Sequence, residues 1–329
     1  MFHSFCFDFS VWEMYGALLF GGRLVVVPKA VAQDARLFGK LLANQGITVL
    51  NQTPSAFYML QEQVVGEAKS LSVRYVIFGG EALNPAKLKP WKGAYPNCKL
   101  INMYGITETT VHVTYLALDE HHLDSSNSRI TGTPERGSPI GKPIPTLTTY
   151  VLDADQNEVP VGEVGELYVG GAGLARGYLN QPELTAQRFI PHPFSPELGE
   201  RLYRSGDLAR QLPGGELEYL GRIDEQVKIR GYRIELGDIE GAMLQYPGVK
   251  HAVVVAKDDA GGSKRLVGYI VPDCVFDRTG LTQFLHTRLV DAPVQGAGGH
   301  SDSPVHSLDP PAGQRSARVA GRNPHAGGS

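Results

Sequence analysis

The sequence predicts an α/β fold, with a large domain built from a parallel sheet and helices and a smaller α+β domain after it. In the first third of the chain, strand-like segments over residues 46–51 and 73–78 flank a helix-like segment over 54–66. This alternation is typical of βαβ units, whose strands run parallel. From residue 148 onward, short strands separated by turns indicate a small β-barrel-like subdomain within the large domain.

The other elements are predicted from hydrophobic periodicity and turn residues. A strand is predicted over 21–28, a helix over 30–44 and a polar loop over 119–138. Residues 290–329 contain almost no large apolar side chain, so we expect them to be disordered. Further strands are predicted over 98–101, 111–115, 149–152, 165–169 and 216–220, and the smaller domain from a helix over 233–244 and strands over 249–256 and 266–271.

The composition excludes several classes of protein. With 42% hydrophobic and 20% charged residues, the 329-residue chain suits one large or two modest globular domains. Its net charge of −3 offers no basic surface for nucleic acid or membrane, and no apolar run approaches transmembrane length. Cys6, Cys98 and Cys274 are too few and too scattered for a disulfide framework or a zinc site. We therefore expect a cytoplasmic protein that binds neither nucleic acid nor membrane.

The loop over residues 102–110 combines several chemical groups directly after a predicted strand. Open α/β sheets bind ligands at the carboxyl ends of their strands. The loop offers the flat ring of Tyr104, the hydroxyl of Thr107 and the carboxylate of Glu108. An aromatic face, hydroxyls and an oxygen ligand for Mg²⁺ together favour a nucleoside triphosphate. A polar turn between two strands would have a similar composition, so the loop by itself leaves both interpretations open.

The stretch 102–108 resembles the Asn-x-Tyr-Gly-x-Thr-Glu motif of adenylate-forming enzymes, and specifically of the adenylation domains of nonribosomal peptide synthetases. Ile106 stands where that family more often has proline, which changes loop stiffness more than chemistry. The resemblance extends from residue 2 to about residue 288. The other motifs of the family lie in the expected order at residues 7–13, 165–167 with 170–179, 203–208 and 221–235.

The resemblance implies three regions and an activity. Residues 1–221 correspond to the C-terminal portion of the large AMP-binding domain and 222–289 to part of a small lid domain, while 290–329 lie outside the family. The implied reaction joins ATP and an amino acid into an aminoacyl-AMP and pyrophosphate. The acyl group then passes to a phosphopantetheine thiol on a carrier protein. ATP and Mg²⁺ are the implied cofactors, and the peptidyl carrier and condensation domains of a synthetase are the implied partners.

The resemblance also implies roles for individual residues. Thr107 contacts phosphate and Glu108 holds Mg²⁺, both as catalytic residues, and Asp224 is the hinge. Lys228 would also be explained as a solvated strand lysine. The implied nucleotide-binding residues are Gly80, Glu81, Asn102, Tyr104, Asp207, Arg222 and Lys228.

The same comparison implies an amino-acid pocket. Asp8 is the family's partner for the α-ammonium group of the substrate. An acyl-CoA ligase, the alternative within this superfamily, would not need that carboxylate, and the motif at residues 7–13 argues against it. The pocket positions resemble the combination that the family associates with threonine, and they are Asp8, Phe9, Trp12, Asn51, Ile77, Gly79, Met103, Val111 and His112.

Two motifs of the family do not occur among the 329 residues: the Ser/Thr/Gly-rich phosphate loop ending in Pro-Lys-Gly, and the C-terminal Gly-Lys. Backbone N–H groups of the first hold the triphosphate, and the lysine of the second reaches the acyl phosphate. The alternative interpretation is therefore an inactive, truncated remnant, and we expect this polypeptide by itself not to form an adenylate at an appreciable rate.

Overall fold

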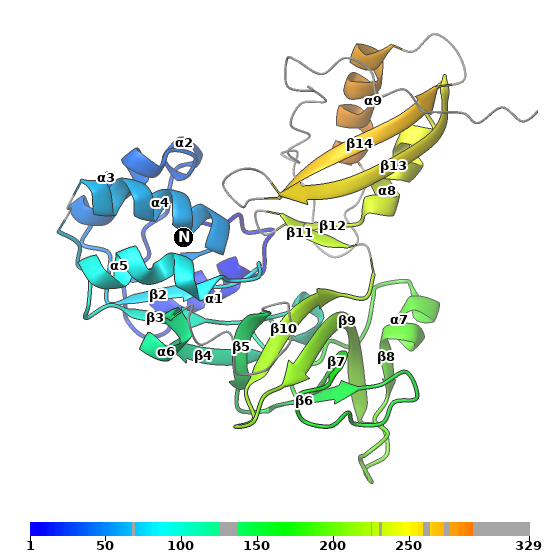
Figure 1. Ribbon diagram of the computed structural model, residues 1–329, viewed down its shortest axis with the longest axis horizontal. Helices are drawn as coiled ribbons and strands as arrows, with labels where there is room; N and C mark the ends of the chain where they lie inside the picture. The colour runs from blue at the N-terminus through cyan, green and yellow to red at the C-terminus, as the bar shows by residue number, and fades with distance from the viewer. Residues whose placement is uncertain are drawn as a thin grey trace, which may run out of the picture.

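The computed structural model describes residues 1–67, 70–124, 137–224, 226–229, 232–258, 264–272 and 277–291. Within these residues one sheet has the strand order β1-β2-β3-β4-β5-β10-β9-β7-β6, and β8 pairs with β9 (Figure 1). β1, β2 and β3 run parallel, which confirms the predicted α/β fold with a parallel region. The strands are β1 (Val49–Gln52), β2 (Tyr75–Phe78), β3 (Lys99–Asn102), β4 (Thr114–Leu118), β5 (Ser138–Pro143), β6 (Leu147–Leu152), β7 (Val164–Gly171), β8 (Phe189–Pro191), β9 (Arg201–Gln211) and β10 (Leu217–Arg222).

The parallel strands bring their carboxyl ends to one edge of the sheet. Asn51 of β1 lies beside Ile77 of β2, and Ile77 lies beside Ile101 of β3. The loops that follow β2 and β3 begin at Gly79 and Met103. β4 then returns beside β3 in the antiparallel sense. The predicted pocket residues of three separate segments therefore meet at this edge, where open α/β sheets bind ligands.

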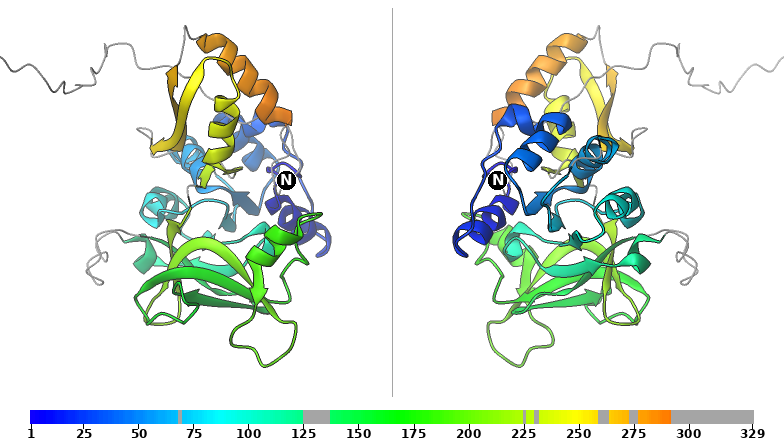
Figure 2. Two further views of the ribbon diagram at one scale, coloured as in Figure 1. Left: turned by 90° about the vertical axis from the view of Figure 1, so that its right-hand side faces the viewer. Right: turned by 90° about the vertical axis from the view of Figure 1, so that its left-hand side faces the viewer.

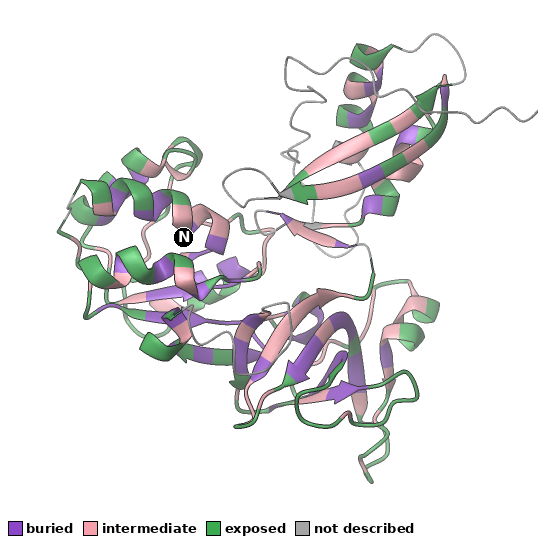
Figure 3. Cartoon of the chain, in the orientation of Figure 1, coloured by how far each residue is buried: buried purple, intermediate pink, exposed green. Residues whose placement is uncertain are grey.

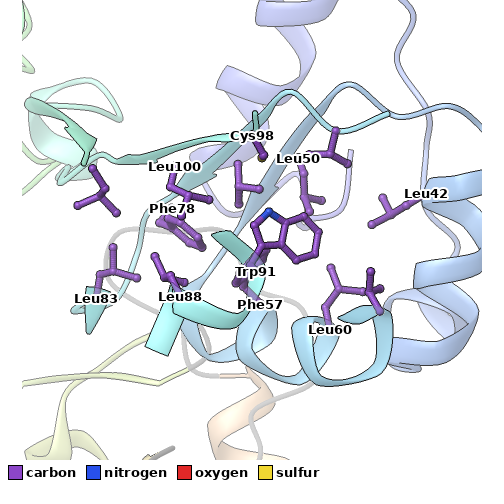
Figure 4. Packing of buried hydrophobic residues seen from close by; sticks show 14 of the residues in the cluster. Leu42, Leu50, Phe57, Leu60, Phe78, Leu83, Leu88, Trp91, Cys98 and Leu100 are labelled. Carbon is purple, nitrogen blue, oxygen red and sulfur yellow. The ribbon is translucent and has the colours of Figure 1, made fainter. Parts of the chain in front are cut away.

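Helices α3 (Ala35–Asn44), α4 (Pro54–Gly66) and α5 (Lys89–Ala94) pack on the parallel strands through a shared apolar core (Figure 4). The indole of Trp91 in α5 is fully buried there, and its ring centroid lies 4.9 Å from that of Phe57 in α4. Large aromatic side chains contribute more buried apolar area than any others, so this core fixes the parallel strands. The other helical segments are α1 (Phe9–Leu18), α2 (Lys29–Ala32), α6 (Glu120–Leu123), α7 (Pro182–Arg188), η1 (Pro85–Leu88) and η2 (Thr107–Thr109).

The antiparallel strands pack around a second core, which includes Val113, Ile140, Leu167 and Tyr203. Figure 3 shows the buried stretches of β7 and β9 that contribute to it. Register shifts interrupt the pairing of β7 with β9 and of β10 with β9. Such irregularities bend strands. The sequence predicts a small β-barrel-like subdomain in this part of the chain; in the structure these bent antiparallel strands belong to the same sheet as the parallel strands.

The C-terminal elements have a core of their own, built on Leu236, Met243, Val254, Leu281 and Leu285. Figures 1 and 2 show them apart from the large sheet, with β11 and β12 between the two. No helix among the described residues is long and apolar enough to cross a membrane. The elements are β11 (Val227–Ile229), β12 (Tyr232–Ile234), α8 (Leu236–Leu244), β13 (Val249–Asp258), β14 (Lys264–Pro272) and α9 (Arg278–Asp291).

Two predictions about elements are wrong, and two elements begin later than predicted; one of these is the strand predicted over 111–115, which begins only at Thr114 as β4. The helix predicted over 30–44 is broken into α2 and α3 because Asp34 has extended backbone and its carboxylate accepts the N–H groups of Arg36 and Leu37, which starts a new helix. The run 21–28 forms no strand in the described part of the chain; the N–H of Val27 donates to the carbonyl of Met1 instead. The helix predicted over 233–244 starts later, because residues 232–234 pair with β11.

Two predictions about loops concern residues that are only partly described. The polar loop over 119–138 contains the short helix α6 and the start of β5, and residues 125–136 lie outside the described part. Of the predicted disordered segment, residues 290 and 291 complete α9, and 292–329 lie outside the described part.

Candidate active site

A cavity of about 450 Å³ opens at the carboxyl ends of β2 and β3 and extends to the end of β10 and to β11. Five separate parts of the chain line it, and they carry most of the residues predicted to bind a nucleotide. Ser55, Tyr219 and Gln226 also line it and were not predicted. The predicted residues in its lining are Gly80, Glu81, Asn102, Tyr104, Arg222, Asp224 and Lys228.

Tyr104 is held by a buried polar network at the floor of this cavity. Its hydroxyl donates to Asp207, which is only 1% exposed, although 103 residues separate the two in sequence. The Nη1 of Arg222 donates to the other oxygen of Asp207 at 2.7 Å, and its Nε and Nη2 donate to Asp224 at 2.6 Å. The Nζ of Lys228 lies 5.7 Å from the centroid of the Tyr104 ring. The hydroxyl of Tyr104 is thus used for positioning, and its ring lines the cavity.

Burial and neighbouring charges both change the pKa values of Tyr104 and Arg222 in this network. Burial, followed by the negative charge of Asp207, raises the pKa of Tyr104 well above its usual range. Burial works against the charge of Arg222, but its bonds to Asp224 and its attraction to Asp207 outweigh burial and raise the pKa of Arg222. Tyr104 is therefore neutral and Arg222 charged across the physiological range.

Gly80, Glu81 and Asn102 shape another wall of the cavity. Gly80 has a φ of +81°, and a Cβ there would lie 2.9 Å from the Cζ of Phe7. The carboxylate of Glu81 accepts the N–H of Ser55 at 3.0 Å, and the amide of Asn102 donates to the carbonyl of Pro139 at 2.7 Å. Glycine at position 80 is required both by the left-handed backbone and by the lack of room.

The predicted amino-acid pocket is assembled around Phe9, at the start of α1. Phe9 packs with Ile77 and Met103, and a Cβ on Gly79 would lie 3.3 Å both from the Phe9 ring and from the carbonyl oxygen of Met103. The Phe9 ring also meets His112 edge to face, with centroids 5.4 Å apart. The structure therefore brings together pocket residues from α1, β2 and the loops after β2 and β3.

Trp12 and Asn51 form the other side of this group. The indole Nε1 of Trp12 donates to the Oδ1 of Asn51 at 3.0 Å. The Trp12 ring also lies near His112, with centroids 5.7 Å apart. Trp12 thus fixes the orientation of the Asn51 amide, whose oxygen accepts the indole N–H.

His112 is the most unusual of these residues. It is 7% exposed, and neither ring nitrogen has a hydrogen-bond partner among the described residues. Burial lowers the pKa of His112 to about 4, so the ring is neutral at pH 7. A neutral imidazole has one N–H donor and one acceptor nitrogen. A buried polar side chain without partners is costly and is often found where a ligand completes its bonding.

The turn before His112 has an unfavourable backbone conformation. Thr110 and Val111 both have a φ of 66°, which is rare for side chains branched at Cβ. The chain then returns beside the preceding loop, where the N–H of Val113 donates to the carbonyl of Tyr104 at 2.8 Å. Unfavourable backbone of this kind persists only where the surroundings impose it, commonly at functional sites.

Three further predicted residues lie beside the cavity and the predicted amino-acid pocket: Asp8, Thr107 and Glu108. The hydroxyl of Thr107 donates to the carboxylate of Asp8 at 2.7 Å. Burial raises the pKa of Asp8, and the Thr107 bond and the charge of Lys228 act in the opposite direction. The carboxylate of Glu108 accepts the hydroxyl of Tyr178 at 2.7 Å.

Comparison with known proteins shows the family of this chain. Residues 1–179 match the sequence family described as AMP-binding enzyme. This chain belongs to that family. It is 54% identical over 271 residues to a plipastatin synthase protein of Bacillus subtilis (strain 168), covering 82% of this chain and 10% of that protein. It is 51% identical over 305 residues to the dimodular nonribosomal peptide synthase of the same strain, covering 90% of this chain and 12% of that protein.

Among solved structures, this chain resembles PA1221, described as a nonribosomal peptide synthetase protein containing adenylation and PCP domains. The TM-score is 0.72 at 28% identity, with 86% of this chain and 54% of the other covered. The chain spans about a tenth of the length of the curated relatives it matches.

Several residues of the site were not predicted from the sequence. Tyr219 lines the cavity, with its ring centroid 6.0 Å from that of Tyr104. The alternation in β10 indicates that Tyr219 shares a face with Leu217 but not which face. Tyr178 lies inside the motif at 170–179, yet no spacing rule connects it to Glu108. His3 and Glu13 likewise lie behind Phe9 without a sequence signal for that contact.

Proposed function

We propose that the residues of this chain serve the activation of an amino acid, threonine, with ATP. In this reaction a carboxylate oxygen of threonine attacks the α-phosphorus of ATP, a new O–P bond forms, and pyrophosphate leaves. The proposal extends to transfer of the threonyl group to the phosphopantetheine thiol of a carrier domain, with AMP as the leaving group. The carrier step is supported by the similarity to proteins described as peptide synthases and to an adenylation–PCP protein.

The cavity at β2 and β3 suits the nucleotide. The Tyr104 ring offers a flat face for the base, and Gly80, Glu81 and Asn102 offer backbone and amide groups along its edge. We assign the ribose to the charged groups around Asp207, Arg222 and Lys228, whose side chains converge at the other end. Concave sites with one apolar surface and a few fixed polar groups are typical of cofactor and substrate binding.

Glu108 and Thr107 would face the phosphates. Among the described residues, no cluster of three or more His, Cys, Asp or Glu side chains is arranged to hold a metal. This fits Mg²⁺ in a nucleotide site, because Mg²⁺ commonly takes one or two carboxylates and completes its shell with phosphates and water. When bound, Mg²⁺ would offset the negative charge of the phosphates, and Tyr178 would keep the Glu108 carboxylate oriented.

Asp8 would bind the α-ammonium group. Its carboxylate lies at the start of α1, next to Phe9 of the pocket, and Thr107 connects it to the predicted phosphate side. Burial disfavours the charge on Asp8 in the free protein. A substrate ammonium would supply the counter-charge that favours the ionised carboxylate. Reorientation of the Thr107 hydroxyl would release an oxygen of Asp8 for this bond.

The observation that carries the threonine assignment is His112 with its unsatisfied ring nitrogens. A hydroxyl in the pocket can both donate to and accept from a neutral imidazole. Ile77, Met103 and Val111 would contact the methyl group of threonine, and Gly79 leaves room for it. A pocket that bonds a hydroxyl discriminates strongly against an isostere without one, but weakly against a substrate that lacks one methyl.

Binding of sulfamoyl-adenosine analogues of threonyl-, seryl- and valyl-adenylate to the 329-residue chain tests this proposal by calorimetry. We expect the threonyl analogue to bind tightest, the seryl analogue about 10–200-fold weaker and the valyl analogue about 10⁴-fold weaker. His112→Phe should remove the preference over valine, whereas His251→Phe, at an exposed histidine on β13, should keep it.

AMP is the probe for the nucleotide cavity alone. If AMP binds but the threonyl and valyl analogues bind equally, the hydroxyl is not recognised and the threonine assignment is wrong. If neither AMP nor any analogue binds, the adenylation proposal itself fails for this chain.

A further inference from the structure

The sequence motif at residues 7–13 ends in Glu13, which the proposed reaction does not use. Glu13 lies in α1 with its carboxylate directed at the preceding segment of chain. It accepts the N–H of Phe2 at 3.0 Å and the N–H of His3 at 3.1 Å. Its Oε1 also lies 3.4 Å from the Nδ1 of His3, and the His3 and Glu13 side chains are only 6% and 3% exposed. The buried carboxylate thus holds the backbone at Phe2 and His3 and lies beside the His3 ring, whose nitrogens have no hydrogen-bond partner among the described residues.

His3 contacts Phe9, a residue of the predicted amino-acid pocket. Its ring stacks on the ring of Phe9, with centroids 4.7 Å apart and planes inclined by 19°. Phe2 and Phe7 meet the same imidazole edge to face, at 5.2 Å and 5.4 Å. The imidazole is thus enclosed by three aromatic rings and one carboxylate, which leaves it little freedom to move.

Phe9 lies between His3 and the predicted amino-acid pocket. Its ring contacts His112 and lies 3.3 Å from the position of a Cβ on Gly79. Any displacement of the Phe9 ring therefore changes the space next to Gly79 and the approach to His112. Because packed interiors have few voids, the ring stays in place only while something fills the volume behind it.

We infer that Glu13 and His3 are positioning residues that set the Phe9 ring and thereby the width of the amino-acid pocket. This inference rests on the proposed function, because it concerns the side-chain selectivity of the same site. Neither residue touches the substrate: His3 supports Phe9 by stacking, and Glu13 orients His3. Without the flat ring of His3, Phe9 has no planar surface to stack on, so its ring can tilt out of its present position and the pocket admits a larger side chain.

The test compares the affinities of the 329-residue chain for threonyl- and leucyl-sulfamoyl-adenosine. The ratio of the two dissociation constants is the informative quantity, since partial unfolding lowers both apparent affinities by the same factor and leaves their ratio unchanged. We expect His3→Leu, which keeps apolar volume but loses the flat ring, to shift the ratio toward the leucyl analogue about tenfold, the scale of a methylene-sized change in a pocket.

Further variants separate the two residues. His3→Phe keeps a flat ring on Phe9 and should retain the ratio within about twofold, well under the methylene scale. Glu13→Gln replaces the carboxylate that accepts the N–H groups of Phe2 and His3 and lies beside the His3 ring, and should shift the ratio in the direction of His3→Leu. His251→Ala, at an exposed histidine on β13, is the matched control and should behave like the unaltered chain.

AMP affinity should be the same in all of these proteins once corrected for the folded fraction. An unchanged ratio in both His3→Leu and Glu13→Gln, with the threonyl analogue still bound, would overturn the inference and leave the proposed function intact. Failure of the unaltered chain to prefer any aminoacyl analogue over AMP would instead count against the proposed function. If His3→Leu does not fold, His3→Phe and Glu13→Gln decide: retention by the first with a shift in the second supports the inference, and any other result overturns it.

Discussion

His112 should make the fold sensitive to mild acid. The residue is only 7% exposed, and burial lowers the pKa of His112 from 6.5 to about 4. Above pH 6.5 the residue is neutral in both the folded and the unfolded chain, so it adds no pH dependence. Below pH 6.5 the unfolded chain binds a proton that the folded chain rejects, so the free energy of unfolding falls as the pH falls, until the ring is also protonated in the folded state near pH 4.

The size of this effect follows from the two pKa values. With 6.5 for the unfolded and about 4 for the folded chain, the free energy of unfolding should drop by about 2 kcal/mol between pH 7 and pH 5 and by about 3 kcal/mol in total. His112→Phe keeps an aromatic ring against Phe9 and Trp12 but cannot be protonated. The difference between the two proteins isolates His112, because carboxylates and other histidines titrate in both.

Urea unfolding followed by tryptophan fluorescence at pH 7, 6 and 5 measures this difference. Trp12 lies 5.7 Å from His112 between ring centroids, so its emission reports on the same region. His251→Phe serves as the control and should show the pH dependence of the unaltered chain. A constant difference between the unaltered chain and His112→Phe across this range, or an NMR titration midpoint near 6.5 for His112, would refute the assignment of a buried neutral imidazole.

The remaining predictions concern stability. Leu60→Ala should lower the free energy of unfolding by about 2–5 kcal/mol in urea, since Leu60 is 1% exposed in the core under α4, whereas Leu37→Ala at a 44% exposed position should change it by less than about 0.5 kcal/mol. A loss below about 1 kcal/mol at Leu60 would mean that this core is not packed as described. Arg222→Ala should cost about 3–5 kcal/mol because Asp207 keeps its burial and loses its 2.7 Å partner. Adding Asp207→Asn should restore part of that loss, and equal stability of the single and double variants would contradict it.

Local features of the sequence predict much of the fold. Alternation of apolar segments with helix-like segments indicates β1, α4 and β2, and Pro54 and Gly66 mark the ends of α4 as predicted. The aromatic ring, hydroxyl and carboxylate in the loop at 102–110 indicate a ligand site at the end of a strand. These predictions succeed because helix periods, strand runs and turn residues depend on neighbours in the chain.

Some local predictions fail where a tertiary or capping contact is stronger. The apolar run at 21–28 has strand propensity, but a strand also needs a partner, and the described residues offer it no place in the sheet. The helix predicted over 30–44 is split at Asp34, where a side-chain bond to the backbone competes with helix continuation.

The sequence by itself determined which chemical groups are available and roughly which elements carry them; the tertiary structure decided which of them meet. Tyr104 and Asp207 are 103 residues apart, and their hydrogen bond exists because β3 and β9 belong to one curved sheet. The absence of partners for His112 within the described chain, and the stacking of His3 on Phe9, likewise depend on packing. Contacts of this kind are set by strand register and by the filling of a common core, quantities that no local pattern of residues encodes.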